Sequence, residues 1–321
     1  WTRFRRRQVR RRQVRRRQVR RWRQVDHRQN ENTPPSWNNV SEQWTGAPAI
    51  EGTKSQEMWV EASEGFSLRV LEWVPNSPAE EGVVVFVPGW GSVFEGWRPL
   101  IGEWARHRRI VYIETREKGS SKIGREVSKS DFTIECLSSD IIAVLDSMGI
   151  DSGEVDWFSS SLGSTVLIDS FQMGRLSGRS SILLAPNLDF KFPFWARLLM
   201  WAPLPKWTYS RMMRVAMLAV DKKVKEEGQK VRYRRAMLSQ NLERMLLSAR
   251  FLMGYSIPED LSSIRVPCAV MTASSDKLHG MEKILDIVQR IPGAEMIEVP
   301  SNQYAHEADV LKEIREFQSS V

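Results

Sequence analysis

Cysteine and long apolar runs are both scarce in this chain of 321 residues. The two cysteines, Cys136 and Cys268, are too few and too far apart in sequence to indicate a disulfide framework or a metal site. No segment reaches the run of about 18 apolar residues that a transmembrane helix requires, and the N-terminal region has no apolar core of a signal peptide. These absences argue against a disulfide-stapled secreted domain and a membrane-spanning protein, and they predict a cytoplasmic location.

Positive charge is unevenly distributed. The formal net charge of +8 suggests a nucleic-acid or membrane binder, but residues 1–28 hold 14 Arg against the single acid Asp26, so the remaining chain is mildly acidic. The Arg-Arg-Arg-Gln-Val repeat of residues 5–19 places its valines on no single helix or strand face. We therefore predict a disordered low-complexity tail over residues 1–28 and a disordered linker over residues 29–57.

The tail has three interpretations. Arginine tracts bind nucleic acid through its phosphates, and an Arg-rich leader without acids can be an organellar targeting segment. A tandem nucleotide repeat translated into the reading frame also explains the perfect period of five residues. We favour the third interpretation, so nucleic acid is not the expected partner.

Residues 158–164, Phe-Ser-Ser-Ser-Leu-Gly-Ser, lie between an apolar, strand-like run and a helix-like run. A serine at a sharp strand-to-helix turn has a strained backbone, and only small residues fit two positions before it and two after it. Ser159 and Gly163 hold those positions around Ser161, although Ser159 replaces the usual glycine and would tolerate a positive φ less well. The pattern predicts Ser161 as a nucleophile, and a serine-rich turn without chemistry is the alternative.

The partners of a nucleophilic serine follow it along the chain as an acid and then a histidine. The chain has four histidines: His27, His107, His279 and His306. The first two precede the serine, and the third comes only three residues after the best acid candidate, which leaves His306 as the general base. Asp276 ends an apolar run over residues 270–276, as expected at the carboxyl end of a parallel strand. It would orient His306 and stabilise its cation without taking the proton; a helix cap is the alternative for Asp276.

Residues 82–87 form a continuous apolar run, which is typical of a strand covered on both faces. The run leads directly into Pro-Gly-Trp-Gly-Ser at residues 88–92. The glycines would let the chain turn over the nucleophile, so that the backbone amides of Trp90 and Leu162 point at a developing oxyanion. Pro-Gly-x-Gly is also a common loop sequence, and only its position directly after the apolar strand indicates a role in oxyanion binding.

These segments together resemble the α/β-hydrolase superfamily from about residue 58 to the end of the chain. Residues 87–92 are similar to its oxyanion segment, with Pro88 where histidine is usual. Residues 114–121 are similar to its Asp-x-Arg-Gly-x-Gly-x-Ser loop, with Glu114 for Asp and Glu117 for a glycine. Pro-Gly-Trp-Gly is most similar to small carboxylesterases that cleave acyl-carrier-protein methyl esters, and more loosely to lipases and thioesterases. Epoxide hydrolases and haloalkane dehalogenases of this fold need Asp as nucleophile, which Ser161 argues against.

The pattern of elements predicts an α/β fold. Residues 58–60 and 66–74 form an expected antiparallel edge pair, and strands then alternate with helices, which indicates a mostly parallel central sheet with helices on both faces. The predicted hydrolase domain covers residues 58–321. Between about residues 187 and 257 the alternation stops, and a helical cap is expected there, inserted after the sixth strand.

The expected cap is basic and rich in aromatic residues. Residues 187–255 carry 14 Lys or Arg and 5 Asp or Glu, a balance that would attract an anionic carrier or a lipid headgroup. Solvated helix charge is the simpler alternative. The expected basic face comprises Lys222, Lys223, Lys225, Lys230, Arg232, Arg234 and Arg235. The aromatic and Met side chains would form a roof over an acyl chain, an interfacial lid, or ordinary packing against the core.

The sequence thus predicts a serine hydrolase of the carboxylesterase, thioesterase or lipase class. It would cleave a small-molecule or acyl-chain ester or thioester through an acyl-enzyme intermediate, with no metal or organic cofactor implied. The alternative is a non-catalytic α/β-hydrolase-like protein that binds a lipid-like ligand or an acidic partner through its basic cap.

Overall fold

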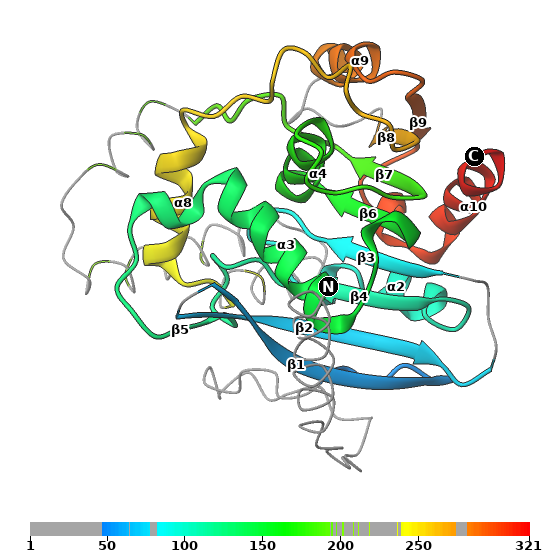
Figure 1. Ribbon diagram of the computed structural model, residues 1–321, viewed down its shortest axis with the longest axis horizontal. Coiled ribbons are helices and arrows are strands. Elements are labelled where there is room, and N and C mark those ends of the chain that lie inside the picture. Colours follow the sequence, from blue (N-terminus) through cyan, green and yellow to red (C-terminus); the bar gives the residue numbers. More distant parts are fainter. Residues whose placement is uncertain are drawn as a thin grey trace, which may run out of the picture. The chain divides into compact units, whose positions relative to one another are not determined.

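The computed structural model (Figure 1) describes residues 47–63, 65–77, 82–192, 239–273 and 281–321, and single positions at 194, 197, 201, 208, 211, 218 and 236. All of them belong to one compact unit, Glu42–Val321. The predicted tail, most of the predicted linker and most of the predicted cap lie outside the described residues.

A nine-stranded sheet forms the centre of the described structure. Its strands are β1 (Thr53–Ser63), β2 (Phe66–Pro75), β3 (Val83–Val87), β4 (Arg109–Ile113), β5 (Lys122–Ile123), β6 (Val155–Ser160), β7 (Ser180–Leu184), β8 (Cys268–Ala273) and β9 (Glu295–Val299). Their order is β1-β2-β4-β3-β6-β7-β8-β9, with β5 paired to β2. The pairs from β4 to β9 are parallel and those of β2 are antiparallel, which confirms the mostly parallel sheet.

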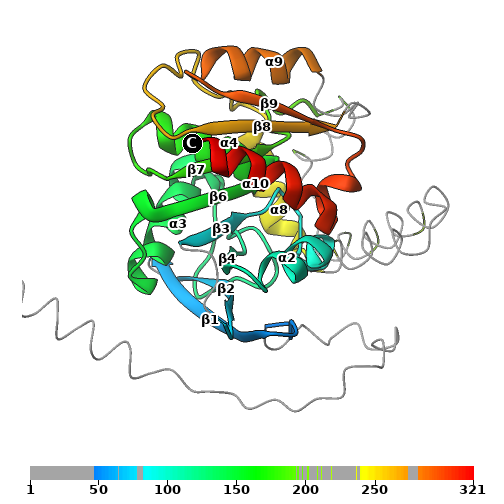
Figure 2. The same cartoon turned by 90° about the vertical axis from the view of Figure 1, so that its right-hand side faces the viewer.

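Helices cover both faces of this sheet (Figures 1 and 2). The helices of the described residues are α2 (Arg98–Trp104), α3 (Ile134–Met148), α4 (Leu162–Gln172), α8 (Leu242–Leu252), α9 (Met281–Arg290) and α10 (Leu311–Ser320), and α8 lies beyond the ends of the strands (Figure 1). Apolar side chains of α3, α4 and α9 pack into one core cluster, and those of α2 and α10 pack into another. Strands β3 and β6 are buried along their whole length between these clusters, which explains why their sequences do not alternate.

The folded region starts earlier than the sequence predicts. Strand β1 begins at Thr53, and its register pairs Lys54 with Val74 of β2, so residues 53–57 belong to the sheet and not to the linker. This first half of β1 is polar and lies on an edge strand, so it lacks the apolar alternation that marks the other strands. The two-residue strand β5 also had no such signal. The six strands predicted before the cap are all present in the structure. The short strand β5 is an additional one, so the predicted cap segment follows the seventh strand, β7, and not the sixth.

Candidate active site

Ser161 connects strand β6 to helix α4 and has an unusual backbone conformation, with φ 47° and ψ −112°. Among the described residues, only Ser161 and Ala185 combine a side chain with a positive φ. Such a conformation costs roughly 1–3 kcal/mol and persists only where its surroundings enforce it. The Ser161 N–H donates to the Leu184 carbonyl at 2.8 Å, and the Ser161 carbonyl accepts from Thr165 N–H at 3.0 Å. The serine therefore lies at the sharp strand-to-helix turn that its sequence context predicts.

The two flanking small residues have different reasons to be small. A Cβ on Gly163 would lie 2.2 Å from the Val87 carbonyl oxygen, so only glycine lets α4 approach β3 this closely. Ser159 is part of strand β6 and has no positive φ. Its Oγ lies 3.0 Å from Ser164 Oγ and 3.3 Å from the Ile182 carbonyl. Because residue 159 has no positive φ, serine is not strained at this position. Its buried hydroxyl has hydrogen-bond partners in Ser164 and Ile182.

The loop after β3 lies directly against the serine turn. A Cβ on Gly89 would come within 3.1 Å of Ser161 Cβ, and the Gly89 N–H donates to Ser160 Oγ at 2.9 Å. The loop itself is a tight turn, closed by a hydrogen bond of 3.0 Å from Ser92 N–H to the Gly89 carbonyl. Gly91, its third residue, has φ 70°, a conformation that favours glycine.

Two backbone amides near Ser161 have no hydrogen-bond acceptor within the described part of the chain. One belongs to Trp90 in the turn, and the other belongs to Leu162, the first residue of α4. The N–H groups of a helix's first turn have no partner within the helix. These are the two amides that the sequence predicts as oxyanion donors, and a negatively charged oxygen is the acceptor that such donors stabilise best.

Asn187 contacts the serine hydroxyl, which the sequence analysis missed. Its Nδ2 donates to Ser161 Oγ at 2.9 Å. Thr165 Oγ1 holds the Asn187 backbone, because it accepts from the Asn187 N–H and donates to the Asn187 carbonyl, both at 3.1 Å. The position of Asn187 in the sequence could have indicated it. Asn187 closely follows β7, which neighbours the strand that carries the serine. Polar residues at the carboxyl ends of parallel strands are typical of ligand-binding sites.

His306 lies in the short helix η4 (Tyr304–His306), which follows β9. Its ring stacks on Trp97, with ring centroids 3.7 Å apart, and its Nδ1 lies 2.9 Å from the Gly96 carbonyl oxygen. Because a carbonyl oxygen can only accept, this contact places the proton on Nδ1 and leaves Nε2 as the acceptor nitrogen. Ser161 Oγ accepts from Asn187, and His306 bonds to the Gly96 carbonyl. Within the described residues, neither of these hydrogen bonds joins the serine to the histidine.

Several predicted residues lie outside the described ranges. Asp276 is one of them, and the basic cluster of the predicted cap is another, comprising Lys222, Lys223, Lys225, Lys230, Arg232, Arg234 and Arg235. Of the aromatic residues in the predicted cap segment, Phe194 is 79% exposed and Trp201 is 60% exposed. The guanidinium of Arg250 in α8 lies 5.4 Å from the centre of the Trp201 ring, a cation–π contact.

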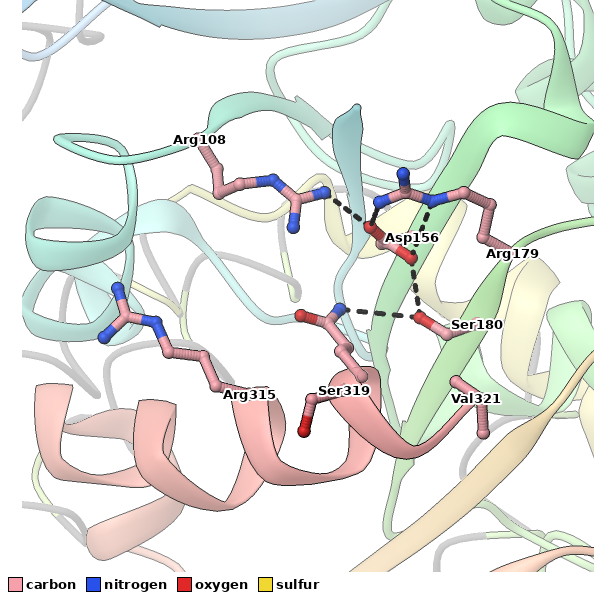
Figure 3. Close-up of a pocket in the computed structure, with 8 residues that line it drawn as sticks. Arg108, Asp156, Arg179, Ser180, Arg315, Ser319 and Val321 are labelled. Carbon is pink, nitrogen blue, oxygen red and sulfur yellow. Dashed lines mark hydrogen bonds and ion pairs between the residues drawn. The ribbon is translucent and has the colours of Figure 1, made fainter. Parts of the chain in front are cut away.

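A cavity of about 450 Å³ lies at the other end of the same strands (Figure 3). It is lined by Arg108, Asp156, Arg179, Ser180, Arg315, Gln318, Ser319 and Val321. The buried carboxylate of Asp156 accepts from Arg108, from Arg179 and, at 2.7 Å, from Ser180 Oγ. Burial would raise the pKa of Asp156, but these hydrogen bonds outweigh it and hold the pKa below its ordinary value. Asp156 is near the start of β6, roughly 16 Å from Ser161 at the rise of a strand.

The described residues contain no group of three or more His, Cys, Asp or Glu side chains placed to hold a metal ion. None of the helices in this part of the chain is long and apolar enough to cross a membrane.

No family model and no curated protein matches the chain. Solved structures do match it. A thermophilic esterase from Thermogutta terrifontis superposes with a TM-score of 0.64 at 17% identity, over 83% of this chain and 98% of that chain. The enol-lactonase from Burkholderia xenovorans has a TM-score of 0.62 at 16% identity, over 82% and 97% of the two chains. An epoxide hydrolase from Vigna radiata has a TM-score of 0.62 at 19% identity, over 85% and 100%. With its sheet order and its helices on both faces, the chain has the α/β-hydrolase fold.

Proposed function

We propose that this protein is a hydrolase that transfers an acyl group to water through Ser161. The observation that carries the proposal is the strained backbone at Ser161, because a non-glycine residue at φ 47° is costly and such conformations cluster at active sites. The similar structures named above are an esterase, a lactonase and an epoxide hydrolase, and their common reaction class supports hydrolysis. A serine at the turn favours ester or thioester substrates, since it forms an acyl-enzyme.

In the proposed reaction, Ser161 Oγ attacks the substrate carbonyl while His306 takes its proton. The Nδ1–H of His306 is occupied by the Gly96 carbonyl, so Nε2 is the nitrogen that accepts the proton. The same nitrogen then returns the proton to the leaving group, and water repeats the sequence to release the acid. Asp276 is the proposed carboxylate that stabilises the histidine cation, while the Gly96 carbonyl orients the ring in this structure.

The amides of Trp90 and Leu162 are the proposed donors to the oxyanion of the tetrahedral intermediate. Preorganised backbone donors contribute strongly to such reactions, because they need no rearrangement as charge develops. The Asn187 amide adds a third donor, directed at Ser161 Oγ itself, and it would stabilise negative charge on that oxygen as the proton leaves.

The proposed substrate is a small-molecule or acyl-chain ester of the kind that carboxylesterases, thioesterases or lipases cleave. A basic cap would add attraction for an anionic carrier or a lipid headgroup. A panel of p-nitrophenyl esters and acyl thioesters of graded chain length would identify the acyl group and the leaving group.

A fluorophosphonate probe tests the nucleophile. We expect the folded protein to be labelled at Ser161, and we expect Ser161→Ala to abolish labelling and to lower kcat by roughly 10⁴-fold or more. The matched control is Ser263→Ala, an exposed serine whose backbone N–H, not its hydroxyl, bonds to Gln172. A folded wild-type protein that takes up no probe would contradict the proposal and favour a non-catalytic binding protein.

A further inference from the structure

Glu117 and Lys118 form an ion pair that is buried behind the Gly89–Ser92 turn. Nζ of Lys118 lies 3.1 Å from Glu117 Oε1, and both side chains are only 1% exposed. Two charges removed from water in this way are costly, and an apolar pair of similar volume generally stabilises a fold at least as well. The loop that this segment resembles has a glycine at position 117, so the pair is a departure that its stability alone does not explain.

The ammonium group of Lys118 has three acceptors. Besides Glu117 Oε1, it donates to Thr115 Oγ1 and to the Gly89 carbonyl oxygen, which is 3.4 Å away. Thr115 Oγ1 in turn donates to Glu117 at 2.7 Å, so the pair is held within its own loop. The positive end of the pair is therefore the end that contacts the Gly89–Ser92 turn.

We propose that Lys118 strengthens the oxyanion-binding amide of Trp90. The Gly89 carbonyl and the Trp90 N–H belong to the same peptide group, whose electrons are delocalised from nitrogen to oxygen. A cation at the carbonyl oxygen increases this delocalisation and makes the N–H a stronger donor, as hydrogen bonds in a chain polarise one another. Lys118 is thus a positioning residue that acts through the peptide, and the inference rests on the function proposed for Ser161.

The surroundings hold Lys118 in this place. Its N–H donates to the Thr115 carbonyl at 3.1 Å, and its carbonyl accepts from Arg244 of α8 at 2.8 Å. The next residue, Gly119, donates from its N–H to the Ser239 carbonyl at 2.8 Å. A Cβ on Gly119 would lie 2.5 Å from that oxygen, so the two segments pack as closely as their backbones allow. Burial and these contacts keep the ammonium close to the Gly89 carbonyl and away from water.

The test compares the wild type with the double variant Glu117→Gln/Lys118→Met. This variant removes both charges together, so neither is left buried alone, and we expect it to fold where Lys118→Met alone could fail. Lys312→Met, on the exposed surface of α10, is the matched control. The first readout is NMR of protein labelled with ¹³C carbonyl glycine and ¹⁵N tryptophan. The sequence contains two Gly-Trp pairs, Gly89-Trp90 and Gly96-Trp97, so two signals are expected and the second is an internal reference.

We expect the Gly89 carbonyl and Trp90 amide signals to move upfield in the double variant, with the Gly96-Trp97 signal unchanged. The second readout is the affinity for a trifluoromethyl ketone, which adds to a nucleophilic serine and leaves an oxyanion. This affinity and kcat should each fall about tenfold, less than the loss of an oxyanion donor itself would cause, while KM is unchanged. A structural defect would instead lower the melting temperature and affect KM as well.

Two results overturn the inference. A folded double variant with unchanged Gly89-Trp90 signals and unchanged ketone affinity would overturn it while leaving Ser161 as the nucleophile. A wild-type protein that neither labels with a fluorophosphonate nor binds the ketone would contradict the proposed function, and with it the catalytic role given to Lys118.

Discussion

Strand β6 has a polar cluster at each end, and the two clusters differ in how their polar atoms are satisfied. At the start of the strand, the Asp156 carboxylate accepts from two guanidinium groups and a hydroxyl. The backbone there is ordinary extended strand. After the end of the strand, Ser161 has a strained φ, and the amides of Trp90 and Leu162 have no acceptor among the described residues.

This difference supports the proposal that the Asp156 end serves the fold and the Ser161 end serves chemistry. Nearly all polar groups removed from water are paired. A donor without an acceptor among the described residues, such as the N–H of the buried Leu162, is therefore available to a ligand. The 450 Å³ cavity beside Asp156 lies at the satisfied end (Figure 3). The strained serine and the two amides without an acceptor among the described residues lie at the other end. For this reason we place the proposed active site at the strained serine and not at the hollow beside Asp156.

The largest effect on stability is expected from Asp156→Asn. Removing this charge leaves the buried Arg108 guanidinium without its carboxylate, and we expect the free energy of unfolding to fall by about 3 kcal/mol in urea titrations at neutral pH. Fluorophosphonate labelling of the folded fraction should not change. Asp146→Asn, on the exposed side of α3, is the control and should leave the unfolding free energy within about 0.5 kcal/mol of the wild type.

The pH dependence of this variant sharpens the test. The pKa of Asp156 is lowered in the folded protein, so its contribution to stability is complete above the unfolded pKa of about 4. This stabilisation is lost as the pH falls through the lower pKa of the folded state, because Asp156 is then protonated in both the folded and the unfolded protein. The difference in unfolding free energy between wild type and Asp156→Asn should therefore shrink in acid, and a constant difference would show that the carboxylate's charge is not what stabilises this end.

The next largest effect is expected at the other end, from Asn187→Ala. Loss of the donor to Ser161 Oγ should lower kcat/KM about tenfold, which corresponds to about 1.4 kcal/mol. The control is Asn241→Ala, since the Asn241 side chain accepts from Arg244 N–H and caps α8. It should cost about 1 kcal/mol of stability and leave kcat/KM unchanged. Equal effects of the two variants on kcat/KM would remove Asn187 from the proposed mechanism.

The sequence predicted the sheet because its parallel strands are continuous apolar runs. It also located the turn at Ser161, since only small residues fit on both sides of a serine at a sharp strand-to-helix turn. Asn187 and Lys118 were missed as site residues for a physical reason: each acts through a contact between segments distant in sequence. No local pattern tells which carbonyl Lys118 reaches, or that Thr165 holds the Asn187 backbone.

The Ser159 position shows the opposite error, in which a family pattern was applied too literally. The family's glycine at this position suggests a conformational requirement, but residue 159 lies in an extended strand and needs only to be compact. Its neighbour Gly163 is the position where a side chain would collide with the backbone of β3. Distinguishing these two requirements takes coordinates, because both appear in a sequence as a small residue near a serine.

The smallest expected effect measures the strain itself, by comparing glycine with alanine at two adjacent serines. At Ser160, in the extended strand, glycine should be less stable than alanine by about 0.5–1 kcal/mol. At Ser161, both substitutions remove the same hydroxyl, but only glycine relaxes at φ 47°, so the order should reverse and glycine should be more stable by about 1 kcal/mol. Urea titrations of the four variants give both differences. Because each pair loses the same side-chain contacts, the reversal isolates the backbone term, and the same order at both positions would mean that the turn is not strained.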